Sequence, residues 1–415
     1  MSKIRNIAHF SVHGYFDPEP ILGRTDTGGQ VTYVLELAKY LAQIDDIKVD
    51  IYTRQFEGLD QIAPVNDRVR VVRFPCGPDK FIRKEDIFPY WDEFVDNAMN
   101  FLQENGLRYE VLHGHYWDAG YVCMKLGGRL DQPFFYTAHS LGAWKKEQMG
   151  GNPEEMEKLF KFEERIHWEN ILFRAAKAHT VTTEDGKDTY KRLYEFETPD
   201  MEIIPPGVDI HRFRPLEPGE TERNLETPDK YIFGLSRIDS NKGHVELIRA
   251  FAHVAAKVPD AYLVIGGGSK EPKQHEIDVK NSFLKVVDEL GLGDRVIFTG
   301  YVLDDDLATY YRKASLFVLP SKYEPFGMTT LEAMSCGTPV VVTKFGGIRK
   351  NLKNEYDALM VDPTNEEKFS EAMTRILTDG ALSQRLVENG LKTIRERFSW
   401  EAIAATTLEF YQRYV

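Results

Sequence analysis

The chain has 415 residues, of which 42% are hydrophobic and 12% aromatic, and its 52 basic and 65 acidic residues give a net charge of −13. This length exceeds one ordinary hydrophobic core and predicts two domains, and the composition is that of a globular protein rather than a disordered one. The acidic balance disfavours nucleic acid and anionic membranes as partners, because both attract basic surfaces.

The cysteines and the apolar segments indicate the cellular environment. Cys76, Cys123 and Cys336 are scattered and too few for a disulfide framework or a zinc site. The first residues, MSKIRNIAHFSVHGYFDP, lack the long apolar core of a signal peptide. The longest apolar runs have the length of strands, far short of a membrane span. We therefore expect a reduced, cytoplasmic protein without stable membrane association.

The first half of the chain alternates short apolar segments with helical ones. Residues 28–43 (GGQVTYVLELAKYLAQ) have the period of an amphipathic helix. Strands are predicted at 4–12, 48–54, 68–74, 109–115, 133–139 and 178–183. Such alternation favours a parallel sheet covered by helices.

The second half repeats this architecture after a polar, irregular stretch at Pro215–Pro228, where we place the interdomain linker. The expected domains are 1–214 and 215–397. Strands are predicted at 231–238, 261–268, 295–302, 315–321 and 338–343, and helices at 244–258 and 277–292. The predicted fold class is α/β, with two Rossmann-like doubly wound domains facing a central cleft. Ligands of such sheets bind beyond the carboxyl ends of the strands.

Two loops at predicted strand ends have residues suited to phosphate. Gly28 and Gly29 precede the first helix, where the backbone can approach a ligand and free N–H groups attract phosphate. Their spacing is not the dinucleotide-binding pattern, and an ordinary tight turn explains them equally well. Arg237 and Lys242 flank a short loop between a strand and a helix, and their cations suit a diphosphate. Two solvated surface cations are the alternative.

Histidines and glycines follow other predicted strands. His139 comes directly after an apolar strand, and this position favours a functional role over a structural one. His113, His115 and Asp118 form a weak metal motif, and we expect packing and hydrogen bonding there rather than ligation. The glycine run Ile265–Lys270 is a lesser candidate for the base or phosphate pocket.

The stretch SKYEPFGMTTLEAMSCGTPVV places Glu324 and Glu332 eight residues apart. Between them, Phe326, Gly327 and Met328 bring backbone N–H groups to the start of a predicted helix, where the helix dipole favours a negative group. A carboxylate on the loop can accept hydrogen bonds from sugar hydroxyls, and one on the helix can bind a ribose diol. The spacing therefore fits a nucleotide sugar. A capped helix with solvated acids is the alternative.

Taken together, these segments resemble the retaining GT-B glycosyltransferases. The motifs that carry the resemblance are TGGQ at 27–30, TAHSLG at 137–142, IPPGVD at 204–209, SRIDSNKG at 236–243 and EPFGMTTLEAMSCGTPVV at 324–341. They span nearly the whole chain. The likeness is strongest to the group of sucrose-phosphate and mannosylfructose-phosphate synthases, through HGYFDP, DTGGQVTYVLELAKYLA, VDIYTR, PDKFIRKEDIFPYWDEFV and FKFEERI. The family's last helix crosses back to the first domain, and residues 398–415 suit that role.

The resemblance implies roles for the matching residues. Gly28 and Gly29 would lie beside the diphosphate of the donor, and Arg237 and Lys242 would neutralise its charge. Glu324 would bind the hexose of the donor, and Glu332 would bind the ribose. Backbone contacts would come from Phe326, Gly327, Met328 and Thr329. The catalytic set would be His139, near the reacting carbon, with Arg237, Lys242 and Glu324. Gln30 would lie toward the acceptor. The resemblance also implies no essential metal. It implies no cofactor, because the nucleotide sugar is a co-substrate.

The implied acceptor is a small sugar or sugar phosphate such as fructose 6-phosphate. Its phosphate partners would be Lys80, Arg83 and Lys84. One departure concerns the stretch after FKF, where sucrose-phosphate synthases are expected to be more basic and this chain reads Glu163, Glu164, Arg165. An unphosphorylated acceptor, such as a hexose glycoside or a sugar acid, therefore stays open.

The implied reaction moves a hexosyl group from UDP-glucose or GDP-mannose with retention of configuration. Double displacement would need a carboxylate nucleophile beneath the ring. No residue stands out for that role, so same-face attack, with the departing phosphate taking the acceptor proton, is favoured. Two other functions stay open: a sugar-nucleotide epimerase, without an acceptor pocket, and a non-catalytic nucleotide-sugar sensor. The set of His139, Lys242 and Glu324 argues against the sensor.

Overall fold

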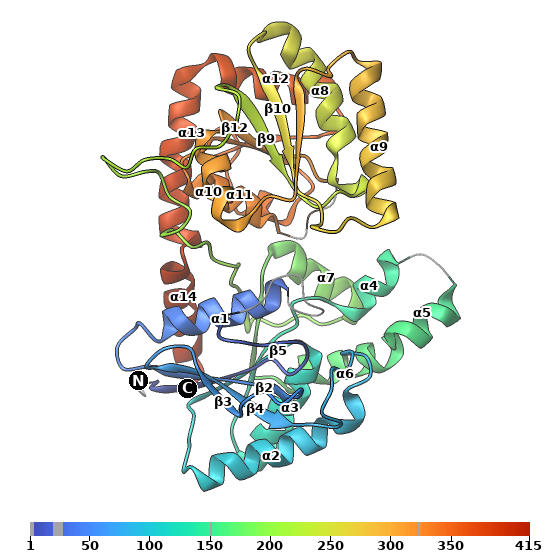
Figure 1. Cartoon of the computed structure of the whole chain (residues 1–415). Coiled ribbons are helices and arrows are strands. Elements are labelled where there is room, and N and C mark those ends of the chain that lie inside the picture. Colours follow the sequence, from blue (N-terminus) through green and yellow to red (C-terminus); the bar gives the residue numbers. More distant parts are fainter. Residues whose placement is uncertain (1–3, 20–27, 150–151, 323, 325) are drawn as a thin grey trace. The chain divides into compact units, whose positions relative to one another are not determined.

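The structure is a computed structural model that describes residues 4–19, 28–149, 152–322, 324 and 326–415. The chain forms two compact units (Figure 1). Unit 1 comprises Met1–Pro206 together with Trp400–Val415, and unit 2 comprises Gly207–Ser399. Unit 2 is therefore inserted between two parts of unit 1.

Unit 1 is built on an eight-stranded sheet in the order β3-β4-β2-β1-β5-β6-β7-β8. The strands are β1 (Asn6–Phe10), β2 (Lys48–Gln55), β3 (Ile62–Pro64), β4 (Val69–Pro75), β5 (Val111–His115), β6 (Phe135–Thr137), β7 (Ala178–Val181) and β8 (Met201–Ile203). All pairs are parallel except that of β3 with β4. The six strands predicted in this half are present, and the short strands β3 and β8 are additional.

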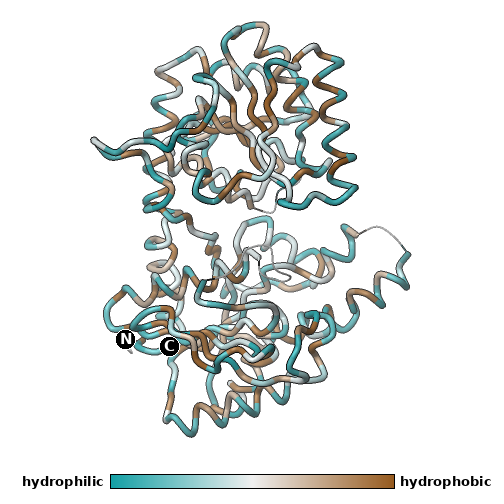
Figure 2. Tube along the Cα trace, in the orientation of Figure 1, coloured by the Kyte–Doolittle hydropathy of each residue, from teal (hydrophilic) through white to brown (hydrophobic). Residues whose placement is uncertain are grey.

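Helices cover both faces of this sheet. They are α1 (Gly29–Leu41), α2 (Trp91–Glu104) with η1 (Phe88–Tyr90) before it, α3 (Trp117–Leu130), α4 (Gly142–Gln148), α5 (Pro153–Phe160), α6 (Phe162–Ala175), α7 (Glu184–Tyr194) and α14 (Trp400–Gln412). Alternate strand residues point to opposite faces: Ile7 packs with residues of α1 and α14, whereas Ala8 and Phe10 pack with α2 and α3. The strands are accordingly the brown, apolar interior of the unit (Figure 2).

Unit 2 has a six-stranded, wholly parallel sheet in the order β11-β10-β9-β12-β13-β14. The strands are β9 (Tyr231–Leu235), β10 (Tyr262–Gly266), β11 (Val296–Gly300), β12 (Leu316–Leu319), β13 (Val340–Thr343) and β14 (Leu359–Val361). The helical segments are η2 (Ser240–Lys242), α8 (His244–Lys257), α9 (Gln274–Glu289), α10 (Asp304–Lys313), α11 (Met328–Ser335), η3 (Gly347–Lys350), α12 (Glu366–Thr378), α13 (Gly380–Thr393) and η4 (Ile394–Phe398). Two doubly wound α/β units, the predicted fold class, are confirmed.

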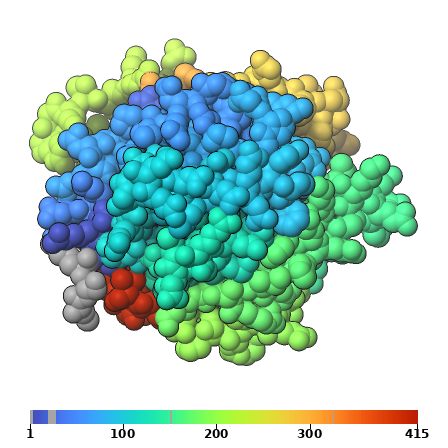
Figure 3. Space-filling model, turned by 90° about the horizontal axis from the view of Figure 1, so that it is seen from below, coloured from blue at the N-terminus to red at the C-terminus, as the bar shows by residue number. Residues whose placement is uncertain are grey.

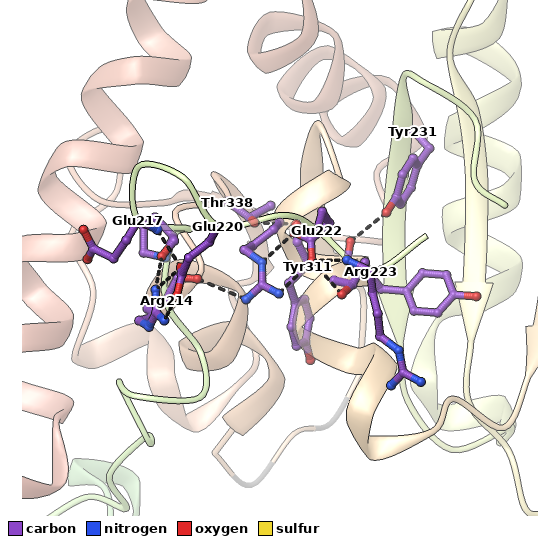
Figure 4. A network of polar contacts seen from close by, with 12 residues as sticks. Arg214, Glu217, Glu220, Glu222, Arg223, Tyr231, Tyr311 and Thr338 are labelled. Carbon is purple, nitrogen blue, oxygen red and sulfur yellow. Dashed lines mark hydrogen bonds and ion pairs between the residues drawn. The ribbon is translucent and has the colours of Figure 1, made fainter. Parts of the chain in front are cut away.

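The stretch Pro215–Pro228 differs from the expected interdomain linker. It is irregular, as predicted, but polar contacts hold it against unit 2 (Figure 4). Glu222 accepts hydrogen bonds from Arg312 over 2.7 and 2.8 Å and from Thr309 over 2.7 Å. Arg214 binds Glu220 through both carboxylate oxygens at 2.7 Å. Charged residues in this stretch therefore fasten it to the unit.

The boundary between the units lies at Pro206 and Gly207 rather than after residue 214. Phe213 explains the difference, because its buried side chain belongs to the core of unit 2 and its carbonyl accepts a hydrogen bond from Ser335. The returning segment begins at Trp400, close to the expected residue 398. The last residues of the chain lie at the surface of unit 1, between segments from the first half of the chain (red in Figure 3). Within the described residues, no helix is long and apolar enough to cross a membrane.

Candidate functional site

Lys242 and Glu324 meet beyond the carboxyl ends of β9 and β12. The Nζ atom of Lys242 donates to Oε2 of Glu324 over 2.8 Å, and the hydroxyl of Ser321 donates to the same oxygen over 3.2 Å. The two side chains are only 13% and 16% exposed. An ion pair so withdrawn from water is screened less than one on the surface. The pair occupies the sheet edge at which doubly wound domains bind ligands.

Gly243 allows the loop after β9 and the loop after β12 to approach each other. Its φ of 71° is left-handed. A Cβ atom at this position would lie 2.0 Å from the carbonyl oxygen of Pro320, which follows β12. Across the same junction, the amide of Lys322 donates to the carbonyl of Asn241 over 3.0 Å. Glycine is therefore required here both by the backbone conformation and by the space.

Arg237 lies on the loop after β9, is exposed, and forms no ion pair with a carboxylate of the described residues. Beside it, the hydroxyl of Ser236 lies 2.8 Å from Nε2 of His244, the first residue of α8. Burial lowers the pKa of His244 to about 4, so this imidazole is neutral near pH 7. Arg237 is thus a free cation at the loop, whereas Lys242 shares its charge with Glu324.

The segment Phe326–Thr329 forms the start of α11. The carbonyl of Phe326 accepts a hydrogen bond from the amide of Ile348 over 3.1 Å, so η3 holds the segment in place. Gly327 precedes the helix with a φ of 105°. The N–H groups of Met328 and Thr329 belong to the first turn, whose amides have no partner within a helix. They and the helix dipole suit a negatively charged ligand.

Glu332 is a half-buried residue of α11. Tyr311 donates to its Oε2 atom over 2.7 Å, and Tyr311 itself is fully buried. Desolvation raises the pKa of Glu332. The tyrosine therefore fixes the orientation of the carboxylate, and no described residue bonds to the other oxygen. That oxygen is the one available to a ligand.

In unit 1, Gly28, Gly29 and Gln30 lie at the start of α1. A Cβ atom on either glycine would have nothing within 4 Å, so the space beside them is open. The side-chain amide of Gln30 donates to Ser11 Oγ over 3.0 Å and to the carbonyl of His115 over 3.2 Å. Gln30 therefore ties the start of α1 to the carboxyl ends of β1 and β5. Its amide oxygen takes no part in these bonds.

His139 follows β6, as predicted, and has a left-handed φ of 54°. Tyr33 meets its ring edge-on at a centroid distance of 5.2 Å, and its Nε2 atom lies 3.0 Å from Nδ1 of His115. Although the side chain is partly exposed, desolvation by these neighbours lowers the pKa of His139 to about 3. A non-glycine residue held at positive φ is strained, and such strain is frequent at functional sites.

A buried ion pair on α6 holds the loop that carries His139. Arg165 and Glu169 are 4% and 0% exposed and lie 2.8 Å apart. Arg165 donates to the carbonyl of Ser140 over 2.7 Å, and Glu169 accepts the amide of Gly142 over 2.9 Å. The loop is thus fixed directly after the strained residue. Arg165, the one basic residue of the stretch Glu163, Glu164, Arg165 that departs from the expected pattern, is occupied inside the protein.

The expected pair of His113 and His115 is buried and hydrogen-bonded, and His9 joins it. The rings of His113 and His115 stack at 4.2 Å. Ligand atoms of the three histidines lie within 4.8 Å of one another, a spacing that a metal ion can bridge, yet each ring nitrogen already has a hydrogen-bond partner. Asp118 lies apart from them, 2.7 Å from His13.

The candidate acceptor residues lie on the segment between β4 and η1. Arg54, which is 2% exposed, braces this segment by donating to the carbonyls of Cys76 over 2.6 Å and Lys80 over 2.8 Å. The side chain of Lys80 is exposed, whereas Arg83 already contacts Glu85 over 3.3 Å. Lys84 is half-buried on the same segment. The acidic neighbours Glu163 and Glu164 lie in the first turn of α6.

The glycine run after β10 borders a pocket of about 310 Å³ within unit 2. Its lining includes Ile238, Gly267, Ser269 and Tyr301. Glu276 closes one side by accepting the amide of Ser269 over 2.8 Å. The pocket therefore has an apolar wall and a few polar groups, as small-molecule sites do.

Several residues around these groups were not among the sequence predictions. Tyr311, Ser236, Arg165 and His9 all contact a predicted residue or its loop. His9 and Ser236 had a sequence signal, since they lie in the strands predicted at 4–12 and 231–238. The motif residues Thr27 and Pro325 lie outside the described residues.

Comparisons with known proteins cover both units. A family model for group 1 glycosyl transferases matches residues 220–393, and one for glycosyltransferase family 4 matches residues 27–212. Mannosylfructose-phosphate synthase from Agrobacterium fabrum is 40% identical over 97% of this chain and 90% of its own length. A probable sucrose-phosphate synthase from Solanum tuberosum is 31% identical over 97% of this chain, which spans 47% of that relative.

A solved structure gives the same result for the fold. Sucrose-phosphate synthase from Thermosynechococcus elongatus superposes with a TM-score of 0.76 and 30% identity, covering 99% of this chain and 98% of that one. The matches span both doubly wound units and include the predicted motifs. The chain is therefore a glycosyltransferase of the GT-B family and belongs to the group of the sucrose-phosphate and mannosylfructose-phosphate synthases.

Proposed function

We propose that the protein transfers a hexosyl group, with retention and without a metal, from a nucleotide-diphosphate sugar to a hydroxyl group of fructose 6-phosphate or a similar small acceptor. One observation carries the proposal: the shielded pair of Lys242 and Glu324, with the free cation Arg237, lies at the ligand-binding edge of the second sheet. This arrangement combines a carboxylate for a sugar with cations for a diphosphate.

The donor occupies unit 2 in this proposal. Arg237 and Lys242 neutralise the negative charge that grows on the leaving diphosphate, and the first-turn amides of α11 assist them. Glu324 accepts a hydrogen bond from a hexose hydroxyl through its second oxygen. The free oxygen of Glu332, oriented by Tyr311, binds the ribose diol. For Gly28, Gly29 and His139 of unit 1, the proposal keeps the roles that the resemblance implies.

The chemistry that fits these residues is attack on the same face that the nucleotide leaves. The bond from the anomeric carbon to the phosphate oxygen breaks, the acceptor oxygen forms the new bond, and the acceptor proton passes to the departing phosphate. All charge stabilisation then comes from side chains and backbone amides. A metal ion has no required part in this scheme.

The acceptor is inferred from the relatives. Both named relatives form phosphorylated disaccharides, and mannosylfructose-phosphate and sucrose-phosphate share a fructose phosphate unit. The greater identity to mannosylfructose-phosphate synthase makes GDP-mannose the first donor to test, with UDP-glucose second. Lys80 is the exposed cation available for the acceptor phosphate.

The test is a matrix of donors and acceptors, run with and without EDTA. The donors are GDP-mannose and UDP-glucose, and the acceptors are fructose 6-phosphate, fructose, a hexose glycoside and a small sugar acid. We expect one donor to be consumed with fructose 6-phosphate, unchanged by EDTA, and the product to keep the α configuration by NMR.

Other outcomes of this activity matrix would indicate a different function or a different mechanism. Better use of an unphosphorylated acceptor contradicts the phosphate contact, and conversion of the donor sugar without acceptor indicates an epimerase. Tight donor binding without turnover across the matrix indicates a sensor. Loss of activity in EDTA that a divalent ion restores contradicts the metal-free mechanism.

A further inference from the structure

A continuous chain of hydrogen-bonded side chains runs through the core of unit 1 and ends at His139. It joins residues of four strands, β1, β5, β6 and β7, to the C-terminal helix. In order from the surface inward, its members are His139, His115, His9, Tyr411, His113, Thr137 and Thr180. Apart from His139, all of them are buried.

The outer part of the chain consists of three imidazole rings and a phenol. His139 Nε2 lies 3.0 Å from His115 Nδ1, and His115 Nε2 lies 3.0 Å from His9 Nδ1. The other nitrogen of His9 lies 3.4 Å from the hydroxyl of Tyr411. Within the described residues, no hydrogen bond uses Nδ1 of His139.

The inner part is more tightly spaced. The hydroxyl of Tyr411 lies 2.6 Å from His113 Nδ1, although the two residues are 298 positions apart. His113 Nε2 lies 2.7 Å from Thr137 Oγ1, which is itself hydrogen-bonded to Thr180. Tyr411 is therefore the junction between the two parts, and α14 supplies it.

The four histidines are neutral, since burial lowers the pKa of His9 and His139 to about 3 and those of His113 and His115 well below the ordinary value. A neutral imidazole has one N–H donor and one acceptor nitrogen. His139, His115 and His9 must then point their protons in the same direction, and a Tyr411 hydroxyl that accepts from one side and donates to the other extends this direction to His113. All four carry it on Nε2, or all four on Nδ1.

The distances from the Tyr411 hydroxyl to His113 and His9 indicate which of these two tautomer arrangements is present. O–H donors make bonds of about 2.5–3.0 Å, and N–H donors make bonds of about 2.7–3.2 Å to oxygen. The 2.6 Å bond to His113 is shorter than N–H donors give and fits a phenol donor. The 3.4 Å contact with His9 is longer than either range and is a weak bond. Because the phenol has a single proton and gives it to His113, His9 must be the donor in this weak bond. Tyr411 therefore donates to His113 and accepts from His9, which places every ring proton on Nε2.

We propose that Tyr411 is a positioning residue that fixes the tautomer of His139 through this chain. With its proton on Nε2, His139 presents Nδ1 as a hydrogen-bond acceptor. It therefore recognises a hydroxyl group of a bound sugar and neither donates a proton nor carries charge. The identity of this ligand rests on the function proposed above, whereas the tautomer itself does not.

The tautomer is measured on the protein without ligands, so that its outcome is independent of sugar transfer. Two-bond ¹⁵N–¹H correlation spectra of ¹⁵N-histidine-labelled protein separate Nε2–H from Nδ1–H rings, and the signal missing from His139→Gln assigns His139. We expect the Nε2–H form for His139. An Nδ1–H or a charged ring overturns the proposal, as does a stoichiometric metal bound to the purified protein, because a metal would occupy the nitrogens of the chain.

Removal of the Tyr411 hydroxyl tests whether α14 influences His139 through the hydrogen-bonded chain. In Tyr411→Phe, we expect the His139 spectrum to change to a mixture of tautomers and kcat/KM to fall about three- to tenfold, the loss of roughly one hydrogen bond. The matched control is Tyr414→Phe, two residues after the end of α14, where the tyrosine hydroxyl donates to Asp200 over 2.9 Å outside the hydrogen-bonded chain. It should leave spectrum and turnover unchanged. An unchanged His139 spectrum in Tyr411→Phe overturns the proposal, even if turnover falls.

Discussion

Lys242 and Glu324 hold opposite charges in a place that water reaches poorly. If a diphosphate binds there, Lys242 exchanges its partner for an anion whose charge grows during the reaction. We therefore expect Lys242→Ala to lower kcat by roughly 10²–10³-fold, as the loss of one preorganised donor does elsewhere. Steady-state kinetics with the donor found by the activity matrix measures this effect.

A second lysine on the neighbouring loop provides the control. Lys322 pairs with Glu246 and its side chain is 45% exposed, so Lys322→Ala removes the same charge from the same region without touching the proposed site. It should retain nearly all activity. Equal losses in the two variants would show that general charge matters there, rather than the position of Lys242.

At the junction between the loops after β9 and β12, glycine is required at position 243 by the lack of space for a side chain as well as by the backbone conformation. Alanine at a left-handed position costs about 1 kcal/mol. In Gly243→Ala, the new methyl group must in addition displace the carbonyl of Pro320. We expect a loss of stability well above 2 kcal/mol and at least tenfold lower turnover, because Lys242 moves with the loop. Calorimetry of the purified variant tests the stability.

The variant Gly58→Ala is a control that separates the cost of the backbone conformation from the cost of the contact with Pro320. The φ of 67° at Gly58 resembles that of Gly243, but a Cβ atom there would meet nothing within 4 Å. Gly58→Ala should therefore lose only the conformational term. If both variants lose the same stability, the contact with Pro320 is relieved by a small movement and does not hold the junction.

Local pattern was enough to predict most of the elements but few of their contacts. The strands ending before Glu324 and His139 were predicted because apolar runs and turn residues mark strand ends. The pairing of Lys242 with Glu324 joins residues 82 positions apart, and nothing in either segment records the other. For the same reason, the sequence did not indicate that Arg165 forms a buried ion pair with Glu169 one turn later. The link of His113 to Tyr411 was equally invisible.

Unit 1 buries several histidines that stay neutral in the folded protein. Those whose pKa is lowered by burial are His9, His113, His115, His139 and His179. Below a pH of about 6.5, the unfolded chain binds protons at these positions and the folded chain does not. The stability of unit 1 should therefore fall as the pH is lowered from 7.5 to 5.5, by about 1.4 kcal/mol for each ring that stays neutral.

Tryptophan fluorescence follows this unfolding selectively. All five tryptophans lie in unit 1, so urea titrations at several pH values report on that unit alone. His179 packs among Phe173 and Phe196, and His179→Phe should reduce the pH slope by about one proton. A stability that does not change between pH 7.5 and 5.5 would mean that the folded rings also take up protons.

The insertion of unit 2 into unit 1 has a consequence for the nascent chain on the ribosome. Helix α14 covers one apolar face of the first sheet, where Ile7 and Phe135 pack against Phe410 and Tyr411. This helix is synthesised only after all of Gly207–Ser399, at least about 10–40 s later at roughly 5–20 residues per second. Unit 2 can thus fold while unit 1 still exposes that face. We therefore expect the nascent chain to expose an apolar surface of the kind that chaperones bind until its last helix has been synthesised.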